Sequence, residues 1–204
     1  MNVVQRATNI MLQPKAEWGV ISGEPATPTS PLTGYAAILS ALPFVIIVLF
    51  ALLLGGIIGL VGGLITGVII LALGLALLYV FGMLANALAP NFGGVKNSIA
   101  ATKLAAYSAT PIWIAVLTIF IPFLNILSPL FMLAAYGYAA YLFYLGSMRL
   151  MGVPSNQAVA YTAVVVLIWL VLSGIIGFII SLVLGAIMLA VMGGAAMTGG
   201  MMYR

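Results

Sequence analysis

The sequence predicts an all-α integral membrane protein, a polytopic bundle of five transmembrane helices preceded by a short interfacial amphipathic helix. Of its 204 residues, 65% are hydrophobic and only 4% are charged, a composition typical of chains that fold in lipid. A bilayer core needs about 20 apolar residues per helix, so the apolar runs between residues 36 and 192 suffice for five or six crossings. No polar insertion is long enough to fold as a second, soluble domain.

The composition argues against several classes of function. The chain contains no cysteine and no histidine, which removes thiol chemistry and the commonest ligands of zinc. Its six basic residues are scattered along the chain, so they form no electrostatic footprint for a nucleic acid. We therefore expect no bound metal, no cofactor and no nucleic-acid partner.

The spacing of the apolar residues in the first segment predicts an amphipathic helix, which ends at Pro14. Lys15 and Trp18 follow, and this pair suits the headgroup layer, where both are expected to anchor the chain. A helix packed on the ends of the bundle explains the pattern equally well. The apolar face of the helix comprises Val3, Val4, Ala7, Ile10 and Met11.

The proline-containing residues 22–34 read as an extended connector, which completes an N-terminal cytoplasmic segment of residues 1–34. The bundle is expected over residues 35–192. Its uncharged run from Ala36 to Ala89 is long enough for two spans, and we place the turn between them near Gly62 and Gly63.

The remaining spans are separated by proline and glycine. A polar loop from about Pro90 to Lys96 precedes a third span at 99–121, and Pro122 closes it. The fourth span is expected at 129–147, with Ser128 as its N-cap. The last apolar stretch, to about residue 192, is either one long tilted helix or a span followed by a bend. Residues 193–204, rich in glycine and methionine, are expected to form a flexible tail.

Four glycines recur at four-residue spacing, which lets helix backbones approach closely in lipid. We expect them to pack the first two spans together, and a contact between protomers is the alternative. They are Gly55, Gly59, Gly63 and Gly67.

The basic residues predict a cytoplasmic N-terminus. Lys96, Lys103 and Arg149 then fall on the same side as the N-terminal segment. We expect Lys103 and Arg149 to reach the headgroups as further anchors. Arg204 lies outside with five spans and inside with six, so charge alone slightly favours six.

The third span carries a candidate helix break. Pro111 cannot donate to the carbonyl of Tyr107, and its ring pushes against that carbonyl, so the helix should kink. Ser108 and Thr110 add hydroxyls at the same place. Broken helices of this kind hold solutes in many transporters, although hydroxyls often only satisfy the freed carbonyl.

No catalytic constellation can be assembled. Glu17 and Glu24 are the only carboxylates, both precede the first span, and Pro25 interrupts their segment. We therefore expect a protein that is not an enzyme.

Several stretches of the sequence form a recognisable pattern when they are taken in order. They are Pro14 to Trp18 with Ile21 and Glu24, Tyr107 to Pro111, Ile121 with Pro122, and Tyr141 to Gly146 leading to Arg149 through Pro154. In their order and spacing they resemble bacterial members of the Yip-domain family, the Ypt/Rab-interacting membrane proteins. The resemblance covers roughly residues 10 to 175, and no single motif in it is specific. It implies five spans with the N-terminus in the cytoplasm and the C-terminus on the far side, in the bacterial inner membrane.

Eukaryotic members of that family partner Rab-type GTPases, but the short N-terminal segment here has little charge for such docking. Two hypotheses of function follow. The first is a non-enzymatic protein that organises membrane lipids, further copies of itself or another membrane protein. The second is a small channel or transporter for an ion, solute or lipid whose path passes the break from Tyr107 to Pro111.

Overall fold

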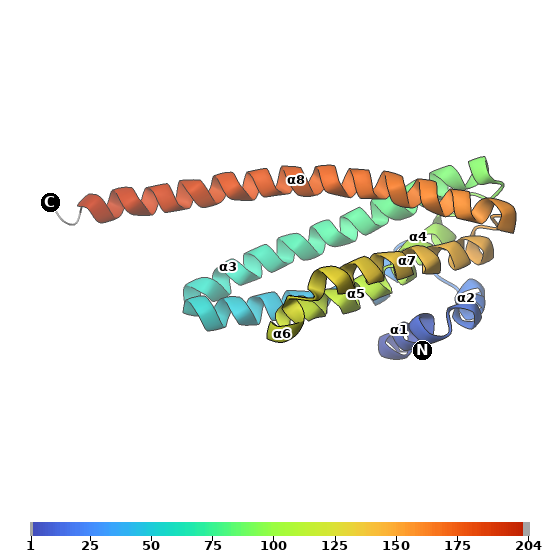
Figure 1. Ribbon diagram of the computed structural model, residues 1–204, viewed down its shortest axis with the longest axis horizontal. Coiled ribbons are helices and arrows are strands. Elements are labelled where there is room, and N and C mark those ends of the chain that lie inside the picture. Colours follow the sequence, from blue (N-terminus) through green and yellow to red (C-terminus); the bar gives the residue numbers. More distant parts are fainter. Residues whose placement is uncertain (1, 202–204) are drawn as a thin grey trace. The chain divides into compact units, whose positions relative to one another are not determined.

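The computed structural model describes the backbone of residues 2–201, and side chains of residues 2–178, 181 and 182. The described residues form helices and their connections, with no strand. In order these are α1 (Val3–Leu12), α2 (Pro14–Gly23), the π-helical η1 (Leu32–Ala36), α3 (Ala37–Leu88), the 3-10 helix η2 (Ala89–Phe92), α4 (Ser98–Ser108), α5 (Thr110–Val116), the 3-10 helix η3 (Leu117–Phe120), α6 (Pro122–Asn125), α7 (Ser128–Leu150) and α8 (Ser155–Met201) (Figure 1).

The chain divides into two compact units after Val165. The first contains every element from α1 to α7 and the first turns of α8. The second is the rest of α8. All the contacts discussed below lie within the first unit.

Helix α3 folds back on itself at Gly56, so it has two limbs instead of one long rod (Figure 1). Gly56 has φ 59° and ψ −142°, a conformation that is open essentially to glycine alone. The turn therefore lies at Gly56 and not near Gly62 and Gly63, where we had expected it. Halving the apolar run could not locate it, because any of several glycines could have made the turn.

Three of the four regularly spaced glycines lie where the limbs of α3 meet. A Cβ at Gly59 would overlap the carbonyl of Ala51, and one at Gly63 would lie 2.6 Å from the Ala51 Cβ. A Cβ at Gly67 would lie 2.6 Å from the Phe44 ring. These glycines thus let the two limbs touch, as small residues do in membrane bundles.

Gly55, the fourth of the series, lies next to the turn, and a Cβ there would meet nothing within 4 Å. It takes no part in the close approach of the limbs. The four regularly spaced glycines therefore have two roles, because Gly55 lies beside the turn and the other three lie where the limbs pack together.

Four helical stretches of the described chain are long and apolar enough to cross a membrane, which makes the protein a polytopic all-α membrane protein. They are Leu32–Phe92, Ser98–Phe120, Ser128–Leu150 and Ser155–Phe178. The first is folded at Gly56, and each of its limbs has about 20 residues or more, the length of one crossing. A count of five requires both limbs to cross, and that number stays a prediction.

The third span is interrupted at Ala109, which has φ −75° and ψ −7°. Helix α4 ends before it and α5 begins after it, with Pro111 in the first turn of α5. The backbone N–H of Ala109 still donates to the carbonyl of Ala105. The break therefore lies next to the proline, as the sequence predicts.

The fourth span is longer than predicted, and the last apolar stretch is one helix. Helix α7 ends before Gly152, whose φ of 65° stops it, and α8 begins after Pro154. The backbone of residues 193–201 continues α8, where the sequence predicted a tail. Residues 202–204 of that tail lie outside the described part of the chain.

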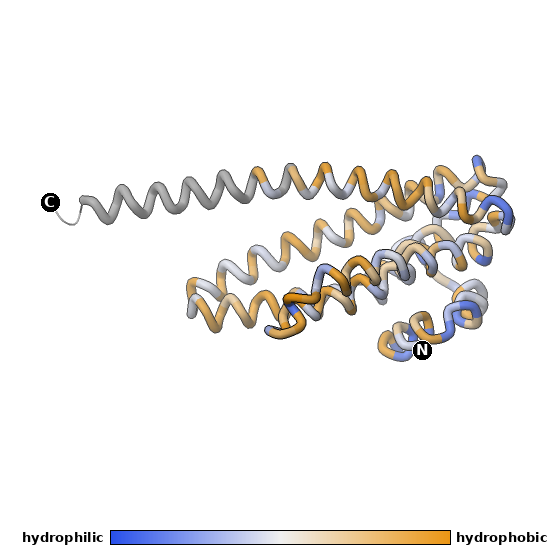
Figure 2. The backbone as a smooth tube through the Cα atoms, viewed as in Figure 1, coloured by the Kyte–Doolittle hydropathy of each residue, from blue (hydrophilic) through white to orange (hydrophobic). Residues whose placement is uncertain are grey.

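The N-terminal segment contains a second helix that the sequence analysis missed. Proline is tolerated in the first turn of a helix, so Pro14 ends α1 and also begins α2. Ile10, Trp18 and Ile21 are almost fully buried, which shows that both helices pack on the bundle. Figure 2 shows that polar residues concentrate at the end of the first unit where these helices and the connecting loops lie, while its limbs are apolar.

Candidate functional site: a buried ion network beside the broken helix

Both carboxylates of the chain bind one arginine. Arg6 Nη1 lies 2.5 Å from Glu17 Oε1, and Arg6 Nη2 pairs with Glu24 Oε1. The side chains of Arg6 and Glu17 are each 6% exposed, and that of Glu24 is 38% exposed. Asn9 adds a hydrogen bond of 3.1 Å from its amide to the second oxygen of Glu17. The charges are thus paired and hydrogen-bonded, as buried charges must be.

The helices α1 and α2 bring these groups together. Asn2 caps α1 by accepting a hydrogen bond from the N–H of Gln5, and Arg6 projects from the buried side of that helix. Glu17 and Glu24 are seven residues apart, two helical turns, so they lie along the same side of α2 and its C-cap. One guanidinium, with its fork of donors, can therefore reach both carboxylates.

Lys103 joins this segment to the third span. Its ammonium donates to the carbonyl of Ile21 at 2.8 Å and to that of Glu24 at 2.5 Å. These carbonyls belong to the last turn and C-cap of α2, where the helix leaves acceptors without internal partners. A cation at this end is favoured by the helix dipole. Lys103 thus holds the C-terminal end of α2 against α4.

Aromatic rings surround the network. The guanidinium carbon of Arg6 lies 5.6 Å from the centroid of the Tyr107 ring, within reach of a cation–π interaction. Tyr107 in turn contacts Trp18 edge-on, with centroids 6.4 Å apart. A Cβ at Gly146 would lie 2.7 Å from the Trp18 ring, so this glycine in α7 makes room for the indole.

At the break itself the hydroxyl of Thr110 replaces the missing proline donor. Thr110 Oγ1 donates to the Tyr107 carbonyl at 2.7 Å, the acceptor that Pro111 cannot reach. That uses the only proton of Thr110, so Tyr35 donates in the 2.7 Å bond between its hydroxyl and Thr110. Thr110 is fully buried. The freed carbonyl is therefore satisfied by side chains of the protein.

Two polar atoms beside the break are buried without a hydrogen-bond partner. They are the Ser108 hydroxyl and the indole nitrogen of Trp18. Ser108 lies one turn after Leu104, and a Cβ at Gly146 would touch both Leu104 and Trp18. Ser108 is the last residue of α4 and Trp18 belongs to α2, and an unpaired buried donor is costly.

Two of the expected interfacial anchors lie inside the protein. Trp18 is 1% exposed and Lys103 is 5% exposed. Helix α2 begins at Pro14 and packs on the bundle, so Trp18 packs against Tyr107 and Gly146, and Lys103 donates to the carbonyls of Ile21 and Glu24. The sequence predicts that the first helix ends at Pro14, and it gives no local sign that the next segment covers the start of α4.

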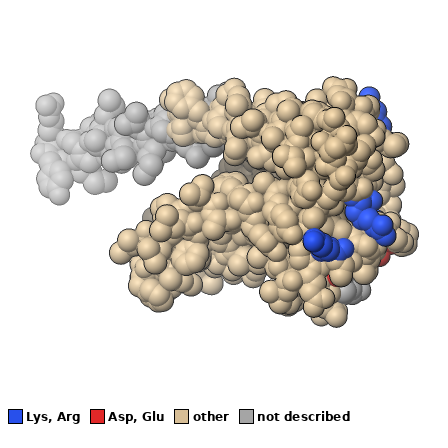
Figure 3. All heavy atoms as spheres, turned by 45° about the vertical axis from the view of Figure 1, so that its right-hand side comes forward, with Lys and Arg blue, Asp and Glu red and all other residues tan. Residues whose placement is uncertain are grey.

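Lys15 and Arg149 are exposed, as anchors would be. Figure 3 shows basic side chains gathered at one end of the first unit, with the rest of its visible face uncharged except for a trace of acidic surface. Whether these two residues contact headgroups stays a prediction.

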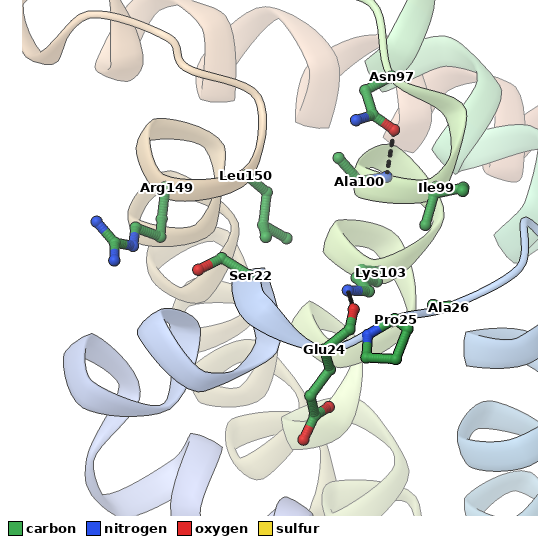
Figure 4. Close-up of a pocket in the computed structure, with 10 residues that line it drawn as sticks. All are labelled: Ser22, Glu24, Pro25, Ala26, Asn97, Ile99, Ala100, Lys103, Arg149 and Leu150. Carbon is green, nitrogen blue, oxygen red and sulfur yellow. Dashed lines mark hydrogen bonds between the residues drawn. The ribbon is translucent and has the colours of Figure 1, made fainter.

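A pocket of about 340 Å³ opens beside Lys103. Figure 4 shows the ammonium of Lys103 directed at the backbone oxygen of Glu24, while the carboxylate of Glu24 points away toward another part of the structure. Arg149 stands at the opposite rim. The lining residues are Ser22, Glu24, Pro25, Ala26, Asn97, Ile99, Ala100, Lys103, Arg149 and Leu150.

The sequence alone does not predict the ion network, because the helix stop expected at Pro14 separates Arg6 from Glu17 and Glu24. Two signals could have found it. The glutamates have helical i, i+7 spacing, and proline near a helix start does not exclude a helix. The pairing of Tyr35 with Thr110, 75 residues apart, had no local signal at all.

In a comparison with protein families, residues 8–176 match the model described as the Yip1 domain. Comparison with curated proteins and with solved structures gives no match. The matched region begins within α1, so it takes in Glu17, Glu24, the broken third span and the first turns of α8.

Proposed function

Because the chain belongs to the Yip1-domain family, we propose that it is a non-enzymatic membrane protein that organises lipids or other membrane proteins around a rigid bundle. The observation that carries the proposal is the buried network in which Arg6 binds Glu17 and Glu24. It fixes the N-terminal helices in one arrangement on the bundle. The basic end of the first unit thereby becomes a preformed surface on which partners can assemble.

The same network supports a role without catalysis. Both carboxylates of the chain are engaged by one guanidinium, so neither is held ready to accept a proton from a substrate. The proposal places the N-terminus in the cytoplasm, and the membrane is the bacterial inner membrane. Further copies of the chain are among the partners it covers.

The test is recovery of partners from membranes. Tagged full-length protein is purified in mild detergent, and co-isolated lipids and proteins are quantified by mass spectrometry. The comparison is with Arg6→Gln, which breaks the network, and with Lys15→Gln, which removes an exposed charge. We expect defined partners with the wild type and Lys15→Gln, and their loss with Arg6→Gln. Recovery of bulk membrane lipid alone by the wild type would overturn the proposal.

A channel or transporter is the second candidate, and the unpartnered hydroxyl of Ser108 beside the broken helix favours it. Against it, Thr110 and Tyr35 already satisfy the freed carbonyl of Tyr107. Flux of labelled ions and small solutes into vesicles separates the two candidates. A transporter should change its flux with Pro111→Ala or Ser108→Ala, whereas a scaffold should show no flux above that of empty vesicles.

A further inference from the structure

The pocket beside Lys103 has the size of a ligand site and carries positive charge. Its volume of about 340 Å³ is in the range of small-molecule sites, which begins at about 300 Å³. Lys103 and Arg149 both line it. Glu24 also lines the pocket, but its carboxylate is paired with Arg6, so neither Lys103 nor Arg149 forms an ion pair among the described residues.

Lys103 supplies a buried donor. Its residue is 5% exposed, and two of its three N–H groups are used on the carbonyls of Ile21 and Glu24. The third remains for a ligand. The carbonyls hold the ammonium in one place, which lowers the entropy that a ligand would otherwise lose in ordering a long side chain.

Arg149 supplies an adaptable donor on the opposite rim. It is exposed in the last turn of α7, and no carboxylate among the described residues pairs with it. Its planar fork of donors matches a phosphate group bidentately. Figure 4 shows Ser22 between the two cations and Asn97 beyond Lys103, where its amide oxygen accepts from the N–H of Ala100. The Ser22 hydroxyl and the Asn97 amide nitrogen can add neutral hydrogen bonds.

The position of the pocket in the fold indicates which kind of anion it binds. It lies at the start of the Ser98–Phe120 span and the end of the Ser128–Leu150 span. These span ends mark the level of the headgroups, with apolar helix surface adjoining on one side and water on the other. An anion bound there can keep acyl chains in the bilayer.

We propose that this pocket binds a phosphate group, and that the phosphate is carried by the headgroup of an anionic phospholipid. This inference rests on the proposed function and deepens it, because it names a ligand for the scaffold. Lys103 binds one phosphate oxygen from the floor of the pocket, and Arg149 closes on the others from the rim.

The experiment measures thermal stabilisation of the full chain in detergent. Dioleoyl phosphatidylglycerol, dioleoyl phosphatidylcholine, inorganic phosphate and glycerol 3-phosphate are each titrated. We expect phosphatidylglycerol to raise the midpoint of unfolding by several degrees and phosphatidylcholine to have little effect. A comparable rise with inorganic phosphate or glycerol 3-phosphate would keep the phosphate site and overturn the lipid as its source.

Matched variants test the pocket. Arg149→Gln and Lys15→Gln each remove one exposed positive charge, but only Arg149 lines the pocket. We expect Arg149→Gln to weaken the apparent affinity for phosphatidylglycerol about tenfold and Lys15→Gln to leave it within twofold. Equal loss in both variants, or in neither, would overturn the proposal, because it would indicate diffuse attraction or none.

Lys103→Met is a second variant, but it can fail to fold because Lys103 pins the end of α2. Arg149→Gln leaves that contact intact and so keeps the test decisive. Partner recovery is measured on the same proteins. Lost lipid stabilisation with unchanged partner proteins overturns only the pocket, while lost partner recovery in every protein, wild type included, overturns the proposed function.

Discussion

Arg6 of α1 and Glu17 of α2 form an ion pair 2.5 Å long in which both side chains are 6% exposed. Such a pair is a weak source of net stability, because desolvation offsets the Coulomb attraction. Removing one partner lowers stability strongly, since the other partner is left buried and charged. The pair therefore fixes the relation of the two N-terminal helices more than it strengthens the fold.

Arg6→Gln is expected to destabilise the protein strongly. It leaves Glu17 buried without a counter-charge, which costs about 3–5 kcal/mol in comparable cases. The free energy of unfolding is measured in detergent by denaturant titration with tryptophan fluorescence. Lys15→Gln, at an exposed position, should change it by less than about 0.5 kcal/mol. An Arg6→Gln protein as stable as the wild type would contradict the buried network.

The double variant Arg6→Met with Glu17→Met should be more stable than Arg6→Met alone. The second change removes the orphaned buried charge, and apolar side chains often replace a buried pair at little cost. Glu24 is 38% exposed on its side chain, so water can solvate it once Arg6 is gone. Additive losses in the double variant would mean that Arg6 and Glu17 do not interact.

Gly59→Ala should destabilise the α3 hairpin. Its new Cβ would overlap the Ala51 carbonyl, a backbone atom that cannot move aside by changing rotamer, and overpacking of this kind costs about 1–3 kcal/mol. Gly62→Ala is the matched control, because a Cβ there meets nothing within 4 Å and alanine favours the helix by about 0.5–1 kcal/mol. Equal effects of the two variants on unfolding would contradict the packing of the limbs.

Thr110→Val should loosen the broken span. The substitution keeps the shape of the side chain but removes the hydroxyl that bonds Tyr35 and the carbonyl of Tyr107. Leaving these buried groups unsatisfied costs about 1–3 kcal/mol. Thr110→Ser keeps the hydroxyl and should retain most of the stability. Hydrogen exchange of residues 105–115 provides the measurement, and unchanged protection in the valine variant would argue against this bond.

A reporter fused after Arg204 should lie outside the cytoplasm. Both limbs of α3 are long enough for a crossing, and the three later stretches then make five in total. Paired alkaline phosphatase and fluorescent protein fusions give the measurement, with a fusion before Met1 as the cytoplasmic control. A C-terminal reporter active only in the cytoplasm would require an even number of crossings.

The sequence was enough to predict the fold class and several helix boundaries. Long uncharged runs must satisfy their backbone groups within helices when no water is present, so the fold class followed from composition. Pro111 and Gly152 act locally on the backbone, so the break lies beside Pro111 and α7 ends shortly before Gly152, although at Leu150 and not at residue 147 as predicted. The resemblance to the Yip family rested on the same local stretches, and the family match confirms it.

Only the tertiary structure decided which of several suitable residues performs each role. The turn lies at Gly56, and Gly59, Gly63 and Gly67 lie where the limbs touch, but a sequence alone does not say which glycine faces a neighbour. Likewise, nothing local to Lys103 reveals that it is buried against the end of α2, far along the chain. Burial and charge pairing depend on distances between helices, and those distances exist only once the bundle has formed.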